Sequence, residues 1–243
     1  MTAHKTNNTP ITWKQRCLRG IGFTLLTCFM LSIGAVVLYK FVPIHHTPLM
    51  LIRSCEALKN GKKVERHHQW TPIEQISPNM VRAVIASEDN LFLQHKGFSF
   101  KQIQLAIKEK QSGKRIRGGS TISQQTAKNA FLTPSKTYLR KALEAYFTIL
   151  IEIIWGKERI MEVYLNIIEM GDGIYGVAAA SEIYFHTTPK QLTSSQSALI
   201  AVCLPNPRRM SPEHPSSYVR KRQTQILKLM PKLGKIDLQN TKE

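Results

Sequence analysis

Residues 138–155 read YLRKALEAYFTILIEIIW, and this stretch says most about the class of fold. Apolar side chains fall on nearly every face of a helix here, and Gly156 follows as a helix breaker. The pattern predicts a helix from Thr137 to Trp155. Its segment 147–155 is too apolar for a solvated helix, so it is either buried at the centre of a helical domain or has one face on lipid.

Further helical patterns lie on both sides of this stretch. We expect helices over 78–87, 157–168, 188–203 and 217–230, and one more that begins after Ser99. Thr188 and Pro189 supply an N-cap and an N1 proline for the helix that reaches Cys203. No segment alternates convincingly with period two, and residues 45–66 stay unassigned. The predicted fold class is therefore mostly α.

An uncharged run of 19 residues, IGFTLLTCFMLSIGAVVLY, occupies positions 21–39. As a helix it would be about 28 Å long, enough to cross the hydrocarbon core of a bilayer. A cleaved signal peptide is the alternative, but its apolar region would be shorter and followed by small residues, which 39–43 do not provide. The run predicts an uncleaved anchor. Its basic flank, residues 1–20, is expected to stay in the cytoplasm.

The composition is that of a globular protein with a large excess of positive charge. The 34 Lys and Arg against 16 Asp and Glu give +18, which fits nucleic acid, an anionic membrane or a phosphate-bearing substrate as partner. Five of the basic residues lie at or before Lys40, so 29 face the 16 acids in the exported part. Export argues against nucleic acid. Four cysteines without C-x-x-C spacing argue against a zinc site, and Cys203 is expected to be buried and free.

The expected organisation has four parts. These are a cytoplasmic tail (1–20), a transmembrane anchor (21–39), a linker leading into the domain (40–72) and a catalytic domain (73–243).

Glu88 and Asp89 end one of the predicted helices, and Phe92 and His95 follow. A carboxylate pair at a helix end can be merely solvated. In a partly apolar cleft, however, a carboxylate can have a raised pKa and act as a general base.

Residues 118–129, GGSTISQQTAKN, form a second polar cluster. Two glycines allow close approach of a ligand to the backbone, and a helix N-terminus favours an anion. A simple capped helix start would explain Ser120 equally well. It would not explain the occurrence of Gln124, Gln125, Lys128 and Asn129 together. Further on, Arg140 and Glu144 share a helix face, an arrangement that an ordinary surface ion pair would also give.

The order and spacing of these groups resemble the family 51 glycosyltransferases, the peptidoglycan glycan polymerases. The resemblance covers residues 73–207. Its five motifs stand as EDNLFLQHKG (88–97), GGSTISQQTAKN (118–129), RKALE (140–144), KERIMEVYLNIIEMGDGIYGVAAAS (157–181) and SALIAVCLPNP (197–207).

The resemblance implies a lysozyme-like, two-lobed, mostly helical domain that takes lipid II as substrate. It implies Glu88 and Glu144 as catalytic residues, Glu88 being the base. It also implies a substrate-binding set, namely Asp89, Phe92, His95, Ser120, Thr121, Gln124, Gln125, Lys128, Asn129, Arg140 and Lys141. In the fourth motif, Lys157, Tyr164 and Asn166 would support the cleft wall, and Gly171 and Gly176 would allow close turns.

Several further expectations follow from the resemblance. The product is a β-1,4-linked glycan chain, formed with inversion and release of undecaprenyl pyrophosphate. No resident cofactor is expected, although a divalent cation could accompany the pyrophosphate. The protein is expected to span the bacterial inner membrane once. Its catalytic domain would then lie in the periplasm, beside the cell-wall synthesis or division machinery. No Ser-x-x-Lys or Lys-Thr-Gly transpeptidase motif is present, so a monofunctional enzyme is expected.

Two rival functions share parts of this pattern. A lysozyme-like enzyme that cleaves peptidoglycan would have the same fold and a catalytic glutamate. A non-catalytic scaffold in the cell-wall machinery would need neither the base nor the cations.

Overall fold

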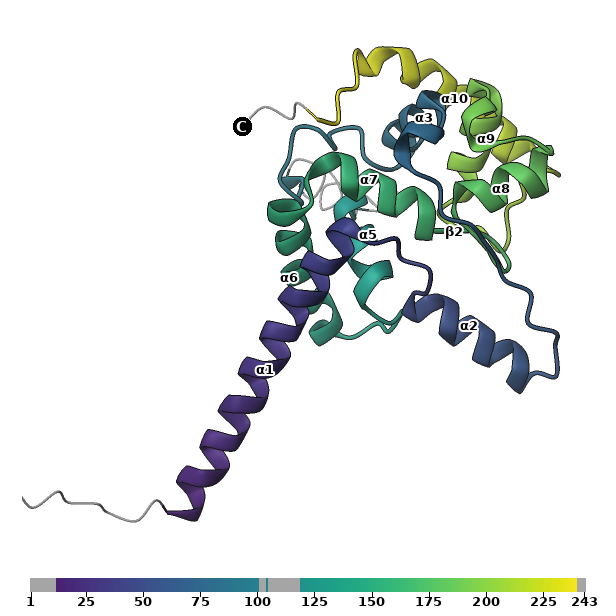
Figure 1. Cartoon of the computed structure of the whole chain (residues 1–243). Helices are drawn as coiled ribbons and strands as arrows, with labels where there is room; N and C mark the ends of the chain where they lie inside the picture. The colour runs from purple at the N-terminus through teal and green to yellow at the C-terminus, as the bar shows by residue number, and fades with distance from the viewer. Residues whose placement is uncertain (1–11, 101–103, 105–118, 240–243) are drawn as a thin grey trace, which may run out of the picture. The chain divides into compact units, whose positions relative to one another are not determined.

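The structure, a computed structural model, describes residues 12–100, 104 and 119–239 (Figure 1). The helix expected after Ser99 lies almost wholly outside these residues. The chain divides into two units, the first ending at Phe41 and the second beginning at Val42. The described residues are mostly helical, as the sequence predicted.

The first unit contains α1 (Trp13–Phe41), drawn in purple in Figure 1. Its 29 residues include the whole apolar run 21–39, and at about 1.5 Å per residue they exceed the thickness of a hydrocarbon core. Hydroxyl groups within the run bond back to the helix: Thr24 donates to the Gly20 carbonyl at 3.0 Å, and Thr27 to the Phe23 carbonyl at 2.9 Å. The apolar helix therefore fits a membrane anchor.

Three helices of the second unit pack together at the top of Figure 1. They are α3 (Pro78–Glu88), α9 (Ser194–Cys203) and α10 (Ser217–Leu229), which the 3₁₀ helix η3 (Met230–Leu233) continues. Val84, Ala198 and Ile226 are fully buried between them. This group positions the C-terminal end of α3, where Glu88 lies.

The helix predicted over 188–203 is wrong in one respect, because it is broken in the middle. A 3₁₀ helix, η2 (Pro189–Gln191), is followed by Leu192, and α9 then begins anew behind a capping box of Thr193 and Gln196. The Leu192 side chain is buried, and its carbonyl accepts a hydrogen bond from the Ser77 hydroxyl at 2.8 Å. This link to a residue 115 positions earlier holds the chain out of helical geometry.

The other main group of helices comprises α5 (Ile122–Phe131), α6 (Tyr138–Ile154) and α7 (Gly156–Ile167). Aromatic side chains join α5 to α6: the rings of Phe131 and Phe147 stack with centroids 4.6 Å apart. Gly156, at φ +75°, separates α6 from α7 and confirms the predicted end of the apolar helix.

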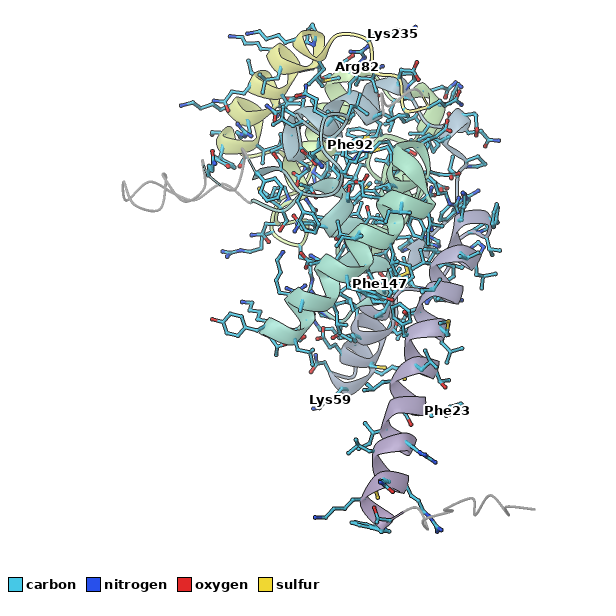
Figure 2. The ribbon with its side chains drawn as sticks, turned by 90° about the vertical axis from the view of Figure 1, so that its left-hand side faces the viewer. Phe23, Lys59, Arg82, Phe92, Phe147 and Lys235 are labelled. Carbon is cyan, nitrogen blue, oxygen red and sulfur yellow. The ribbon has the colours of Figure 1, made fainter. Side chains whose placement is uncertain are left out.

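Helix α6 is not buried on all sides. Glu144, Thr148 and Ile151 face inward and are at most 3% exposed. The opposite side is also apolar but open: Leu139 is 71% exposed and Ile153 is 76% exposed. Figure 2 shows this helix from the side, along its length, with Phe147 labelled. The near-uniform apolarity of 147–155 thus combines one core face with one exposed apolar face.

Residues 45–66, which the sequence left unassigned, contain a further helix, α2 (Pro48–Lys59). Thr47 caps it by accepting from the Met50 amide at 3.2 Å, and Pro48 occupies its first turn. The stretch predicted as a linker is therefore in part regular structure.

A small three-stranded sheet completes the second unit. Its order is β1 (His67–His68), β3 (Ile174–Tyr175), β2 (Glu169–Gly171), with β1 parallel and β2 antiparallel to β3. The 3₁₀ helix η1 (Ile73–Gln75) precedes α3, and α8 (Gly176–Phe185) follows β3. Strands of two or three residues are too short to show an alternating pattern, which is why the sequence did not reveal them.

Two glycines of the fourth motif allow close turns, as predicted. A Cβ on Gly171 would lie 2.0 Å from the Tyr184 hydroxyl oxygen. Gly176 has φ +78°, and a Cβ there would lie 2.3 Å from the Asn166 carbonyl oxygen. Neither position can carry a side chain without moving its neighbours.

Candidate active site

The Glu88 carboxylate lies at the C-terminal end of α3 and is held by two donors. Gln125 Nε2 donates to Oε2 at 3.1 Å, and the Ser87 hydroxyl lies 3.3 Å from Oε1. Burial raises the pKa of Glu88 above the ordinary glutamate value, while both hydrogen bonds act to lower it. A carboxylate so placed is suited to accept a proton from a substrate hydroxyl.

The donor that reaches Glu88 is itself fixed in orientation. Tyr164, which is fully buried on α7, places its hydroxyl 3.4 Å from Gln125 Oε1. Burial raises the pKa of Tyr164 well above its usual value, so its proton stays in place to donate. The amide oxygen of Gln125 is thereby occupied and its NH₂ group points to Glu88.

Asp89 faces the protein interior instead. Its side chain is buried, its Oδ2 lies 2.9 Å from His95 Nε2, and it accepts from the backbone amide of Ile122 at 3.1 Å. Ile122 is the first residue of α5, so the carboxylate complements the positive end of that helix. Phe92 is also fully buried. These three predicted substrate-binding residues, Asp89, Phe92 and His95, shape the site from behind.

The start of α5 is a complete capping box. The Gln124 amide donates to Thr121 Oγ1 at 3.2 Å, and Gln124 Oε1 accepts from the Thr121 amide at 3.0 Å. Thr121 also donates to the Gly97 carbonyl at 2.7 Å. Local capping therefore accounts for Thr121 and Gln124. Ser120 is half-buried before the cap, whereas Gly118 lies outside the described residues.

One helical turn further on, α5 presents Gln125, Lys128 and Asn129. Gln125 and Lys128 are half-buried. Asn129 is 5% exposed, and its Nδ2 has no hydrogen-bond partner among the described residues. Burial lowers the pKa of Lys128, and the nearby Glu144 carboxylate opposes that shift. The first turns of α5 thus link the Glu88 end of the site to a second charged cluster.

Glu144 is the centre of that second cluster. It is 3% exposed and binds both Arg140 Nη1 and Lys141 Nζ on the same helix. Its burial excludes the simple surface ion pair that the sequence left open. Together with Lys128, the cluster holds three cations around one carboxylate, a net positive charge suited to an anionic group.

Two features of the site escaped prediction from the sequence. Glu152, on α6, pairs with Lys157 on α7 at 2.7 Å, and both side chains are under 10% exposed. A lone acid within FTILIEIIW was the available signal, because a charge in an apolar run needs a partner. The second feature that escaped prediction is Arg222 on α10, whose charge lowers the pKa of Glu88. No signal in the basic α10 segment singled it out.

The described residues contain no group of three His, Cys, Asp or Glu side chains placed to hold a metal ion. Positive charge near the site comes from Lys128, Arg140 and Lys141 around Glu144, and from Arg222, which acts on Glu88. Among the described cysteines, Cys55 and Cys203 are both free, and burial raises the pKa of Cys203 to about 12.

A buried carboxylate with a raised pKa, close to a cationic cluster, is typical of enzymes that transfer a group from an anionic leaving group. The comparisons with known proteins agree. The family model described as Transglycosylase matches residues 55–231. The chain is 53% identical over 216 residues to the biosynthetic peptidoglycan transglycosylase of Bacteroides thetaiotaomicron, covering 89% of this chain and 87% of that protein.

Two further relatives carry the same description. The protein of Bdellovibrio bacteriovorus is 52% identical, with 84% of this chain and 81% of the relative covered. That of Caulobacter vibrioides is 48% identical, with 87% and 90% covered. The chain belongs to the transglycosylase family, which confirms the resemblance drawn from its motifs.

Proposed function

We propose that this chain is a peptidoglycan glycosyltransferase that polymerises lipid II into glycan strands. Family membership and the descriptions of its relatives support this assignment. The observation that carries the mechanism is the Glu88 carboxylate, which is held by Gln125 and Ser87 and has a pKa raised by burial.

Glu88 acts as general base on the 4-hydroxyl of the acceptor sugar. The oxygen attacks C1 of the donor sugar, the bond from C1 to the pyrophosphate oxygen breaks, and the proton goes to Glu88. A single displacement of this kind inverts an α-linked donor to a β-1,4 bond without a covalent enzyme intermediate. General base action of this type typically contributes about 10²–10⁴-fold in rate.

Lys128, Arg140 and Lys141 stabilise the charge that develops on the leaving undecaprenyl pyrophosphate. Preorganised cations in a partly buried site act more strongly than in water. Glu144 holds two of these cations on one side of α6. Its role in this proposal is to orient them, so it contributes to the transfer without exchanging a proton.

The membrane has two contacts in this proposal. Helix α1 anchors the chain in the inner membrane with its basic N-terminal flank in the cytoplasm, and the second unit works in the periplasm. The exposed apolar face of α6, formed by Leu139, Leu143, Ile149 and Ile153, is the candidate surface for the outer leaflet. This arrangement keeps the reacting end of a lipid-linked substrate near the site.

A lipid II polymerisation assay tests the proposal. The wild-type chain in detergent should convert lipid II to polymer and release undecaprenyl pyrophosphate, and Glu88→Gln should not. The lysozyme-like alternative would instead release soluble fragments from finished sacculi, and the scaffold alternative would show neither reaction. The relatives' descriptions favour synthesis over cleavage.

A further inference from the structure

A buried ion pair lies where α5, α6 and α7 meet. Lys157 Nζ is 2.7 Å from Glu152 Oε1, and the two side chains are 5% and 8% exposed. The Ser123 hydroxyl of α5 donates to the same carboxylate oxygen. One acid therefore joins three helices that carry Gln125, Glu144 and Tyr164.

The pair is poorly explained as a device for stability. Removing two charges from water is unfavourable, and replacing a buried pair by uncharged side chains of similar volume is often neutral or stabilising. Burial lowers the pKa of Lys157, and the Glu152 carboxylate opposes that shift. An apolar pair of the same volume could fill this space, but it could not place a positive charge where the Lys157 ammonium lies.

The Lys157 ammonium also faces an aromatic ring. It lies 4.6 Å from the centroid of the Phe92 ring, a favourable cation–π distance. Phe92, labelled in Figure 2, is fully buried, and its ring meets that of His95 edge to face at 6.4 Å. His95 in turn pairs with Asp89, the neighbour of Glu88.

Phe92 and His95 belong to the loop 89–97, and Glu152 also lies close to Gly97 at the end of this loop. Gly97 has φ +89°, and a Cβ there would lie 2.8 Å from Thr148 Cγ2 and 3.2 Å from Glu152 Cγ. Loop 89–97 is thus pressed against α6 at Gly97 and against Lys157 at Phe92. One member of the Glu152–Lys157 pair takes part in each contact, Glu152 at Gly97 and Lys157 at Phe92.

We propose that Glu152 is a positioning residue for glycosyl transfer: it holds the Lys157 ammonium against Phe92 and so fixes loop 89–97, which follows the base Glu88. The inference rests on the proposed function. Glu152 touches neither Glu88 nor the cationic cluster, and acts through Lys157, Phe92 and the loop. It predicts a loss of turnover without a matching loss of lipid II binding.

The test compares Glu152→Gln, Lys157→Met and the double variant in steady-state polymerisation of lipid II. We expect each single variant to lower kcat at least tenfold and to change KM less than about twofold. Each single variant also leaves a buried charge alone, so each should melt at a lower temperature. In the double variant the neutral pair should restore the melting temperature, while kcat stays at least tenfold low.

The matched control is Glu162→Gln. Glu162 pairs with Arg159 at 2.6 Å on the same helix, and both side chains are 14% exposed. Because Lys157, and not this pair, faces the Phe92 ring of loop 89–97, the variant should keep kcat within about twofold of wild type. Ser123→Ala, which leaves both charges of the proposed pair intact, should lower kcat about threefold.

The outcomes separate the two proposals. If the wild type does not polymerise lipid II, the proposed function fails. If the wild type is active and the double variant recovers kcat together with its melting temperature, only the positioning role fails. A double variant that does not fold would overturn that role too, because the charges would then serve folding.

Discussion

The amide of Gln125 lies between Glu88 and Tyr164, donating to the carboxylate at 3.1 Å and accepting from the phenol at 3.4 Å. A hydrogen bond to the ionised form lowers the pKa of a carboxylate. Gln125→Leu should therefore raise the pKa of Glu88 and shift the acid limb of kcat/KM to higher pH. Tyr164→Phe should shift the acid limb in the same direction by a smaller amount. The Gln125 amide then stays in place but loses the hydrogen bond from Tyr164 that fixes its orientation. An unmoved acid limb in both variants would mean that Gln125 does not support the base.

Glu88→Gln is expected to lower polymerisation by at least about 100-fold, because an amide cannot accept the hydroxyl proton. A variant that keeps more than a tenth of the wild-type rate would exclude Glu88 as the base.

The same substitution should stabilise the fold at neutral pH. Because folding raises the pKa of Glu88, its contribution to stability is present below the unfolded-state pKa and is lost as pH rises through the folded-state pKa. Glu88→Gln should thus melt above wild type at pH 7, and the difference should vanish below about pH 4, near the ordinary glutamate pKa. Thermal melts across this pH range measure it.

Lys128→Ala and Arg140→Ala should each lower turnover by about 10²–10³-fold, the typical effect of removing one preorganised electrostatic group. Because Lys128 and Arg140 grip one leaving group, the double variant should lose less than the product of the two effects. Lys141→Ala should matter less, since the Lys141 side chain is 49% exposed. Wild-type rates in both single variants would place the pyrophosphate elsewhere.

Ile153→Glu on the exposed face of α6 should slow polymerisation in lipid II-containing vesicles at least several-fold and leave the rate in detergent unchanged. The reason is that a charge on a lipid-facing surface opposes docking. Tyr218→Glu on α10, 57% exposed, is the control and should have no effect in either medium. Equal rates for Ile153→Glu in vesicles and detergent would leave α1 as the only membrane contact.

Local signals in the sequence located most helices, because caps, proline positions and apolar periodicity act within a few residues. The break at Leu192 escaped because it depends on Ser77, which only the folded chain brings near. The small sheet escaped because its strands are too short to show a pattern. In the site, the family resemblance implied roles for Glu88 and Glu144, but the sequence could not show that Asp89 turns inward to the start of α5 or that Glu152 meets Lys157.

Helix α6 sets the distance between Glu144 and Glu152. Glu144 and Glu152 both point to its buried side, and eight residues at about 1.5 Å each set them about 12 Å apart along the axis. The cationic cluster around Glu144 and the contact of Glu152 with Lys157 therefore keep a fixed separation along one helix. One residue inserted between them would turn the far half by about 100° and put the two acids out of phase, whatever its own chemistry. Length, and not only composition, is thus constrained in this segment.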